Sequence, residues 1–287
     1  MKAFDQRVRS VLITGCSSGI GRAAAVHLAR RGFTVFAAVR KESDAENLRG
    51  LGIPGLLPLC PLDLAKPGHI PAVMEAIDRE LAARGQKGLY ALVNNAGGGS
   101  VAPIELMDMA KFRVELYARV AGAAALVQAV LPSLRRSGGR VLWIMTPAII
   151  PTPYVASIHA CDFAVNGLVR TLDIELKPWA IPNIMIRCGG IRTEAVAKSD
   201  AVLEADLAAW PAEKRALYEP ALRKWNASLA SFNAKRTAPE KVAAVLEKAL
   251  ISARPKCRYS IGHMARAAAF LEALPQSWAD RILKARF

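Results

Sequence analysis

Acid–base chemistry is the first possibility that the side chains of this sequence raise. Tyr154, His159 and Asp162 fall within the segment TPYVASIHACDFAVNGL (152–168), and no lysine precedes the next basic residue, Arg170. A free tyrosine has a pKa near 10, and a nearby ammonium group lowers that pKa. Histidine titrates close to neutral pH, and a carboxylate can accept a proton. The segment therefore offers proton-transfer groups but no tyrosine–lysine pair.

A glycine-rich turn, TGCSSGIG, offers a second kind of chemistry. It lies between an apolar run at 8–14 and a helical pattern at 20–31, and it contains Gly15, Gly19 and Gly21. Glycines permit a tight turn and a close approach of a pyrophosphate to the backbone, and the following helix presents free N–H groups and a positive dipole end. The turn predicts a nucleotide-binding site.

Short apolar runs alternate with helical patterns along the chain, and these elements must position the two sites. Nearly all-apolar strands that alternate with helices indicate an α/β fold with a parallel sheet covered on both faces. The length of 287 residues suits one large domain. The expected strands are 8–14, 33–39, 56–63, 89–95, 141–145, 183–188 and 257–262, and the expected helices include 20–31, 69–84, 109–136, a helix that ends near 176, and 239–253.

The segment 193–237 departs from this alternation. It is charged, rich in alanine and helical in pattern, and it follows the sixth expected strand. Ligands bind at the carboxyl ends of such strands, so we expect a lid over a hydrophobic substrate; a helical surface insertion is the alternative. The aromatic side chains spaced along it are Trp210, Tyr218, Trp225 and Phe232.

The tail, 263–287, alternates apolar and basic residues, and we expect a packed helix or an interface helix; contact with a membrane surface is the alternative. We find no run of 18 apolar residues, so no membrane span is expected. The start of the chain leads into a strand without a signal-peptide core. Five scattered cysteines without a CxxC pair favour a reducing compartment, the cytoplasm, and argue against a structural zinc or other metal site.

The formal net charge is +15, from 39 basic and 24 acidic residues. The basic residues are spread along the chain, so we expect a polyphosphate cofactor and a generally basic surface rather than a nucleic-acid partner.

Four motifs, VLITGCSSGIG, LYALVNNAG, ELKPW and GGIRT, resemble the short-chain dehydrogenase/reductase family. The resemblance covers roughly 8–262 and is nearest to the branch of 17-beta-hydroxysteroid and retinol dehydrogenases. It implies a Rossmann-type, doubly wound, seven-stranded parallel sheet in a single domain (1–287). It also implies NADP(H) as the cofactor, and a homodimer or homotetramer formed through helices at about 103–136 and 158–177.

The resemblance assigns cofactor contacts residue by residue. Arg40 and the adjacent Lys41 stand where the family meets the 2′-phosphate of NADP, and no acidic residue ends that strand to bind the bare ribose of NAD. A solvated loop charge is the alternative for Arg40. Asp63 corresponds to an adenine contact. The remaining implied contacts are Gly15, Ser17, Ser18, Gly19, Ile20, Gly21, Asn94, Ala96, Gly97, Gly189, Ile191 and Thr193.

The family uses a Tyr-x-x-x-Lys pair, and two alignments place that pair here. In one alignment, Tyr154 takes the position of the family's tyrosine and Ile158 that of its lysine. The other follows D-FAV-NGLVRTLDI-ELKP in register and puts Ile158 at the tyrosine and Asp162 at the lysine. We favour the second, because one missing residue inside a helix rotates the rest by about 100°.

The family's serine and asparagine positions differ as well. Met145 or Thr146 stands where the family has the serine, and Arg119 stands where it has the asparagine. We hypothesise that Arg119 and Asp162 form an ion pair beside the nicotinamide, because a buried carboxylate needs a partner. A structural salt bridge in an inactive pocket is the alternative. Tyr154, at the expected pocket mouth, and His159 are further acid–base candidates.

Three functions fit these features. The first is an NADPH-dependent reductase of a bulky, largely apolar small molecule in specialised metabolism, for example an iminium, which needs hydride alone. The second is a redox-derived cyclase or isomerase that retains NADP(H). The third is a non-enzymatic NADP-binding or partner-binding protein.

Overall fold

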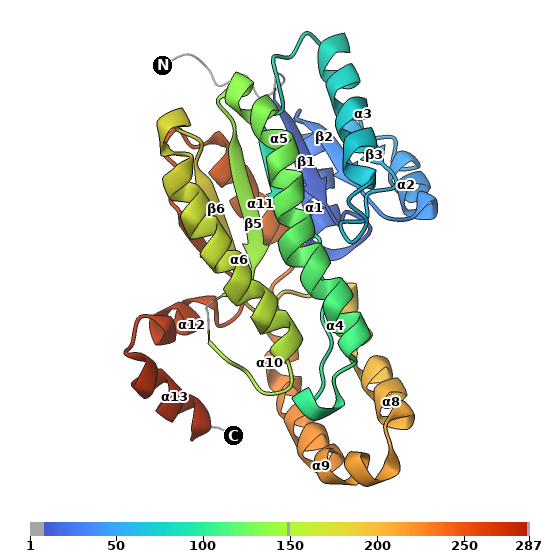
Figure 1. Ribbon diagram of the computed structural model, residues 1–287, viewed down its shortest axis with the longest axis vertical. Helices are drawn as coiled ribbons and strands as arrows, with labels where there is room; N and C mark the ends of the chain where they lie inside the picture. Colours follow the sequence, from blue (N-terminus) through green and yellow to red (C-terminus); the bar gives the residue numbers. More distant parts are fainter. Residues whose placement is uncertain (1–8, 148–149, 286–287) are drawn as a thin grey trace.

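Seven parallel strands form one sheet in the order β3-β2-β1-β4-β5-β6-β7. The computed structural model describes residues 9–147 and 150–285 (Figure 1). The predicted α/β fold with a seven-stranded, doubly wound parallel sheet is confirmed. The strands are β1 Ser10–Thr14, β2 Thr34–Ala38, β3 Leu56–Leu59, β4 Ala91–Asn94, β5 Arg140–Met145, β6 Asn183–Cys188 and β7 Arg258–Ile261.

Helices cover both faces of the sheet. On one face lie α1 (Gly19–Arg30), α2 (Glu42–Arg49) and α11 (Pro239–Ile251), whose apolar side chains join one buried cluster. The other face carries α3 (His69–Ala83), α5 (Ala123–Ser137) and α6 (Ala156–Glu175), which share a second cluster. Both faces of each central strand are therefore buried, which explains the nearly continuous apolar runs in the sequence.

The remaining helices extend beyond the carboxyl ends of the strands (Figure 1). Six of them belong to two segments: 193–237, and the tail that follows β7. Residues 286–287 of that tail lie outside the described residues. The helices are α7 Glu194–Ala197, α8 Ser199–Ala209, α9 Ala212–Ser228 and α10 Ala230–Ala234 in the first segment, and α12 Ala265–Glu272 and α13 Gln276–Lys284 in the second.

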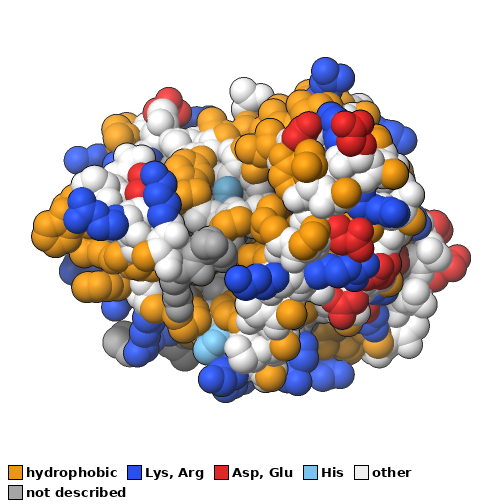
Figure 2. Space-filling model, turned by 90° about the horizontal axis from the view of Figure 1, so that it is seen from below, with side chains coloured by type: hydrophobic (Ala, Val, Ile, Leu, Met, Phe, Trp, Pro, Cys, Tyr) orange, Lys and Arg blue, Asp and Glu red, His pale blue; other side chains and the backbone are white. Residues whose placement is uncertain are grey.

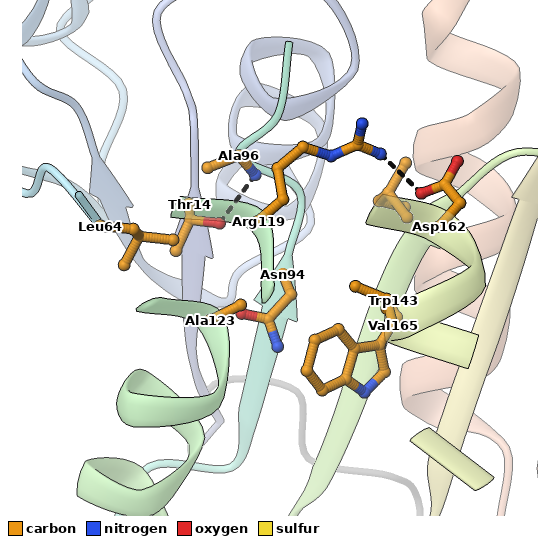
Figure 3. A pocket seen from close by; sticks show the side chains of 10 residues that line it. Thr14, Leu64, Asn94, Ala96, Arg119, Ala123, Trp143, Asp162 and Val165 are labelled. Atoms are coloured by element: carbon orange, nitrogen blue, oxygen red, sulfur yellow. Dashed lines mark hydrogen bonds and ion pairs between the residues drawn. The ribbon is translucent and has the colours of Figure 1, made fainter. Parts of the chain in front are cut away.

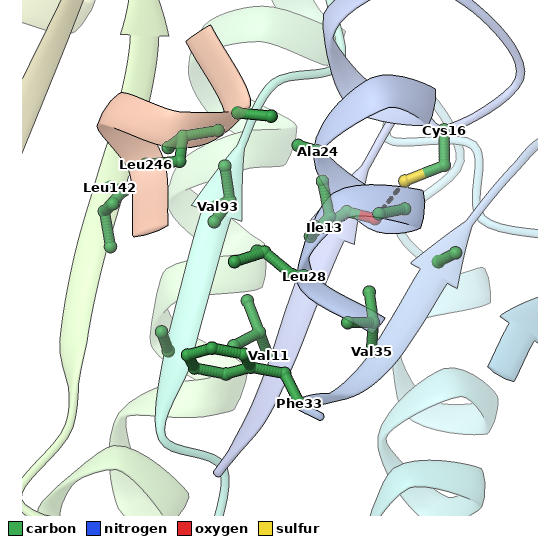
Figure 4. Close-up of a cluster of buried hydrophobic side chains, with 14 of the residues drawn as sticks. Val11, Ile13, Cys16, Ala24, Leu28, Phe33, Val35, Val93, Leu142 and Leu246 are labelled. Carbon is green, nitrogen blue, oxygen red and sulfur yellow. Dashed lines mark hydrogen bonds between the residues drawn. The ribbon is translucent and has the colours of Figure 1, made fainter. Parts of the chain in front are cut away.

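The cluster beneath α1 shows how the sheet holds its first turn in place (Figure 4). Val11 and Ile13 of β1 are fully buried against Leu28 of α1 and against Phe33. Cys16 follows β1, and its thiol donates to the carbonyl oxygen of Ile13 at 3.2 Å. Burial raises the pKa of this thiol well above its usual range, so Cys16 is a core residue rather than a nucleophile.

Two sequence predictions about individual elements were wrong, and one helix was missed. The third strand ends at Leu59 instead of continuing to Asp63, because Pro61 has no N–H to extend a ladder. The helix α2 was not expected. The continuous helix expected at 109–136 is divided into α4 (Met109–Leu116), the π-helical stretch η3 (Tyr117–Gly122) and α5. Such π stretches occur often at functional sites.

The stretch Met109–Ser137 is long and apolar enough to cross a membrane by length and composition, with a mean hydropathy of 1.4. Core helices of sheet proteins meet the same criterion. Here Leu126, Val130 and Leu134 of α5 are fully buried against the sheet. Within the described residues this is the one stretch that meets the criterion, and its C-terminal half serves as a core helix.

Candidate active site

The turn between β1 and α1 is fixed by close backbone contacts. Gly15 and Gly19 have φ of +70° and +56°, in the left-handed region that favours glycine. A Cβ on Gly21 would lie 2.2 Å from the carbonyl oxygen of Gly15. No side chain caps the helix that begins at Gly19, so its first N–H groups are available to an anion. This turn has the shape of a pyrophosphate cradle.

Residues at the end of β4 hold the β1–α1 turn in place through hydrogen bonds. The Asn95 amide donates to the carbonyl oxygens of Thr14 and Gly15 at 2.9 and 3.1 Å. The Thr14 hydroxyl accepts from the backbone N–H groups of Asn95 and Ala96 at 3.0 and 2.9 Å. Asn95 was not among the predicted site residues, although the NNAG motif that contains it was. Its role is to hold the two strand ends together.

The other predicted cofactor residues lie along the same edge of the sheet. Arg40 and Lys41 follow β2 and are exposed. Asp63 follows β3; its carboxylate accepts from the N–H of Ala65 at 3.1 Å, and its own N–H donates to Nδ1 of His69 at 3.1 Å. Nothing in the sequence pattern pointed to His69.

The residues after β6 complete that edge. The predicted contacts Gly189, Ile191 and Thr193 follow this strand. A Cβ on Gly19 would lie 3.3 Å from Cγ2 of Thr193, so the end of β6 reaches the glycine-rich turn. The predicted residues thus converge where ligands bind in open parallel sheets.

Arg119 and Asp162 form the predicted ion pair (Figure 3). Nη2 of Arg119 lies 2.6 Å from Oδ1 of Asp162. The second carboxylate oxygen, Oδ2, accepts from the backbone N–H of Thr146 at 3.2 Å. Asp162 is only 2% exposed, so both of its oxygens are engaged away from bulk water. The pair joins η3 to α6 just beyond the end of β5.

A second carboxylate, Glu115, belongs to this cluster and was missed from the sequence. Its Oε1 lies 3.4 Å from Nη1 of Arg119, and burial raises its pKa although Arg119 acts in the opposite direction. The i,i+4 spacing of Glu115 and Arg119 on one helix was the available signal. The guanidinium is thus held between two carboxylates, Glu115 and Asp162.

Tyr154 and Ile158 occupy different surroundings. Ile158 lies in the first turn of α6, one turn before Asp162, and its carbonyl oxygen accepts from Nη1 of Arg119 at 3.4 Å. Tyr154 precedes the helix with φ of +65°, and its ring meets that of Trp225 edge-on at 5.6 Å. Tyr154 therefore contacts the 193–237 segment, while α6 brings Asp162 to Arg119.

A small cavity of about 20 Å³ lies beneath the ion pair. It has room for one water molecule. Both amide atoms of Asn94 and Nε1 of Trp143 are buried without a hydrogen-bond partner among the described residues. The cavity is lined by Thr14, Asn94, Arg119, Trp143, Asp162 and Val165, among others.

Of the remaining reactive side chains near the cluster, Cys161 is buried, and His159 and Cys188 are partly buried. Burial lowers the pKa of His159, so this side chain favours its neutral form. Burial raises the pKa of Cys161 to about 11 and that of Cys188 to about 12. Both thiols therefore stay protonated near neutral pH.

Residues 9–203 match the family described as short chain dehydrogenase. The chain belongs to this family. It is 38% identical over 192 residues to human 11-beta-hydroxysteroid dehydrogenase type 2, a match that covers 66% of this chain but only 46% of the relative. It is also 31% identical over 268 residues to a 3-amino-tetrahydro-pyrrolizinone reductase of Xenorhabdus hominickii, which covers 90% of this chain and 88% of that protein.

The fold is shared with an alcohol dehydrogenase from the archaeon Thermococcus sibiricus, solved in complex with 5-hydroxy-NADP. The TM-score is 0.67 at 21% identity, over 93% of this chain and 99% of that one. At this identity the likeness shows the fold alone; the assignment to the oxidoreductases of the short-chain dehydrogenase family rests on the match of residues 9–203. Because it spans about half the length of the human relative, that protein's activity is not transferred to it.

Proposed function

We propose that this protein is an NADP(H)-dependent reductase of a bulky, largely apolar small molecule that carries a positive charge at the reacting group, such as an iminium. One observation carries the proposal: Arg119 is held between two carboxylates, Asp162 and Glu115. With both carboxylates ionised, the cluster carries one more negative than positive charge. An opposite charge a few ångströms away favours the charged form of a bound group, so this cluster favours a cationic substrate.

The residues at the strand ends fit a dinucleotide phosphate. The cradle at Gly15 and Gly21 excludes side chains, as a pyrophosphate site requires. Arg40 and Lys41 supply positive charge for a 2′-phosphate, and no acidic residue ends β2. The structural neighbour solved with 5-hydroxy-NADP is in keeping with this choice. When bound, NADPH supplies a hydride.

The chain's own residues suit a reaction that needs no proton donor. Hydride addition to the carbon of a C=N⁺ group moves the π electrons onto nitrogen and neutralises the charge, so the amine forms without a proton. A ketone would instead form an alkoxide that a positioned acid must protonate. We assign Asp162 the role of orienting the cationic group, with Arg119 and the Thr146 N–H holding its carboxylate in place.

The segment 193–237 is proposed as the lid over the apolar part of the substrate. Its base is tied to the end of β6, because the N–H of Thr237 donates to Gly190 and the N–H of Arg192 donates to Thr237, both at 2.9 Å. The ring of Trp225 in this segment meets that of Tyr154, which precedes α6. The pyrrolizinone reductase among the relatives supports a role in specialised metabolism. We further propose a cytoplasmic location.

A homo-oligomer remains our proposal for the assembly. Large apolar side chains are exposed along α4, η3 and α6, on the face that the family resemblance assigns to an interface. Burying such a surface against a second copy would remove it from water. The exposed side chains include Val114, Tyr117, Phe163, Leu168 and Ile174.

A redox-neutral cyclase or isomerase is the second candidate, and the raised pKa of Glu115 favours it. A carboxyl group with a raised pKa can hold a proton nearer to neutral pH and pass it to a substrate. In that case NADP(H) would serve as part of the pocket wall. Product formation without NADPH consumption would identify this activity.

The test uses N-methyl-3,4-dihydroisoquinolinium, a permanently charged iminium, and 1-tetralone, a neutral ketone of similar shape. We expect NADPH to be consumed in step with amine formation from the iminium, and little turnover of the ketone. Asp162→Ala should abolish turnover and leave NADPH affinity nearly unchanged, whereas Asp78→Ala on α3 should change neither. Equal turnover of the ketone, or loss of both properties in Asp162→Ala, would contradict the proposal. Cofactor binding without any turnover would indicate a non-enzymatic protein.

A further inference from the structure

The two helices after β7 form a surface that the proposed function does not use. Past the end of β7, α12 and α13 extend beyond the sheet at the end where the strand carboxyl ends and the 193–237 segment lie (Figure 1). We propose that α12 and α13 dock the protein on an anionic lipid membrane. We call these two helices and Met264, which precedes them, the docking hairpin.

Large apolar side chains project from the hairpin into solvent. On α13, Trp278 and Ile282 are four residues apart and therefore share one face. Trp278 is 62% exposed, and Phe270 at the end of α12 is 67% exposed. Ile282 and Met264 are also among the exposed large hydrophobic side chains. Exposed aromatic and aliphatic side chains on a short amphipathic helix are typical of segments that lie in a membrane interface.

The charges on the hairpin complement an anionic surface. Arg266, Arg281 and Lys284 are exposed. Arg266 lies one turn before Phe270, and Arg281 lies next to Ile282. Figure 2, which views the molecule from this end, shows apolar and basic side chains intermixed over the left part, where α12 and α13 lie. Basic side chains around an apolar face attract anionic headgroups while the apolar groups enter the boundary of the acyl chains.

The hairpin's two acidic residues are withdrawn from this surface. Glu272 pairs with Arg187, a β6 side chain that is 2% exposed. Asp280 is half-buried. A second copy of the same surface would bring like charges together, which disfavours self-association through the hairpin. A lipid surface with negative headgroups would attract these basic side chains, so no repulsion between like charges arises.

The hairpin is attached firmly enough to orient the molecule on a membrane. Arg187 also donates to the side chain of Asn166 on α6 at 3.1 Å, so α12 is linked through one guanidinium to both β6 and α6. Ala265 and Ala279 are buried and seat the two helices. Docking would place the strand carboxyl ends near the lipid. If the proposed function holds, a bulky apolar substrate would be drawn from there.

Vesicle sedimentation with the full chain tests the docking. We expect binding to vesicles of phosphatidylcholine and phosphatidylglycerol (3:1), little binding to pure phosphatidylcholine, and loss of binding in 0.5 M NaCl. Arg281→Glu with Lys284→Glu should weaken partitioning at least tenfold. The matched control is Arg254→Glu with Lys256→Glu, which makes the same charge change in the exposed loop before β7 and should retain most of the binding.

A second measurement separates insertion from general attraction. Brominated lipids should quench the fluorescence of the wild-type protein more than that of Trp278→Phe, because Trp278 would reach the acyl boundary. Equal weakening by the control pair, equal quenching in Trp278→Phe, or no vesicle binding would overturn the proposal. The proposal would also be overturned if the Arg281→Glu/Lys284→Glu variant differed from the wild type in oligomeric state and not in lipid binding. None of these readouts depends on catalysis, so failure of the reductase assay leaves the docking test intact.

Discussion

Two neighbouring parts of the sheet edge are built in opposite ways. The β1–α1 turn is shaped by backbone, with glycines packed so closely that a single added Cβ would lie 2.2 Å from a carbonyl oxygen. The cluster of Glu115, Arg119 and Asp162 is made of side chains carried on helical backbone, which is α-helical at Glu115 and Asp162 and π-helical at Arg119. The first part matches the family's motifs and the second departs from them. A side-chain site can change its charge without moving the helices that carry it, so one fold hosts different chemistry.

Removal of the Arg119 guanidinium should cause the largest loss of folding stability. We expect Arg119→Met to lower the free energy of unfolding by about 3–5 kcal/mol, because it leaves Asp162 buried without its partner. Urea denaturation at pH 7.5 measures this. The double variant Arg119→Met with Asp162→Leu should recover most of the loss. If the double variant were no better than the single one, the pair would not be the coupled unit described above.

The glycine cradle should respond to size instead of charge. We expect Gly21→Ala to cost about 1–3 kcal/mol of unfolding free energy, as overpacking does, and to abolish NADPH binding. Gly167→Ala is the matched control, because a Cβ there meets nothing within 4 Å on α6, and the protein should gain about 0.5–1 kcal/mol. Tight NADPH binding by Gly21→Ala in titration calorimetry would mean that the turn is not the cradle.

The smallest effect concerns Glu115 and pH. Burial raises the pKa of this carboxyl above its ordinary value of 4.5, so the folded chain binds the proton more tightly than the unfolded chain does. The stability contributed in this way is present below the unfolded pKa and is lost as pH rises through the folded pKa. We therefore expect Glu115→Gln to be more stable than the wild type at pH 7.5 and to lose that advantage near pH 4.

Denaturation at the two pH values, with Glu213→Gln on exposed α9 as the control, measures the difference. A Glu115→Gln variant that is less stable at pH 7.5 would show that the bond to Arg119 outweighs the burial of the carboxylate. The cluster would then resemble the cradle, as a rigid structural unit.

The sequence predicted the sheet and the glycine turn because each depends on a local pattern. Apolar runs that alternate with helical periods specify a parallel sheet, and the strand–turn–helix context of Gly15 to Gly21 specifies the turn. The Arg119–Asp162 pair was also predicted, from the family resemblance together with the helical register that placed Asp162. In contrast, η3 and the contact of His69 with Asp63 depend on tertiary packing that leaves no periodic trace. Glu115 was missed because an i,i+4 pair on a helix is ordinarily a surface feature.

Arg187 bears on the order in which this chain folds during synthesis. Its guanidinium sits in β6, and the carboxylate that pairs with it, Glu272, lies 85 positions later in the chain. A ribosome releases β6 well before α12, so in the interval the strand carries a cation whose acidic partner has not yet emerged. Domains fold as units and from the N-terminus during synthesis. This edge of the sheet can therefore reach its final packing only after Glu272 has emerged, and a premature stop before Glu272 would leave an unneutralised charge in the core.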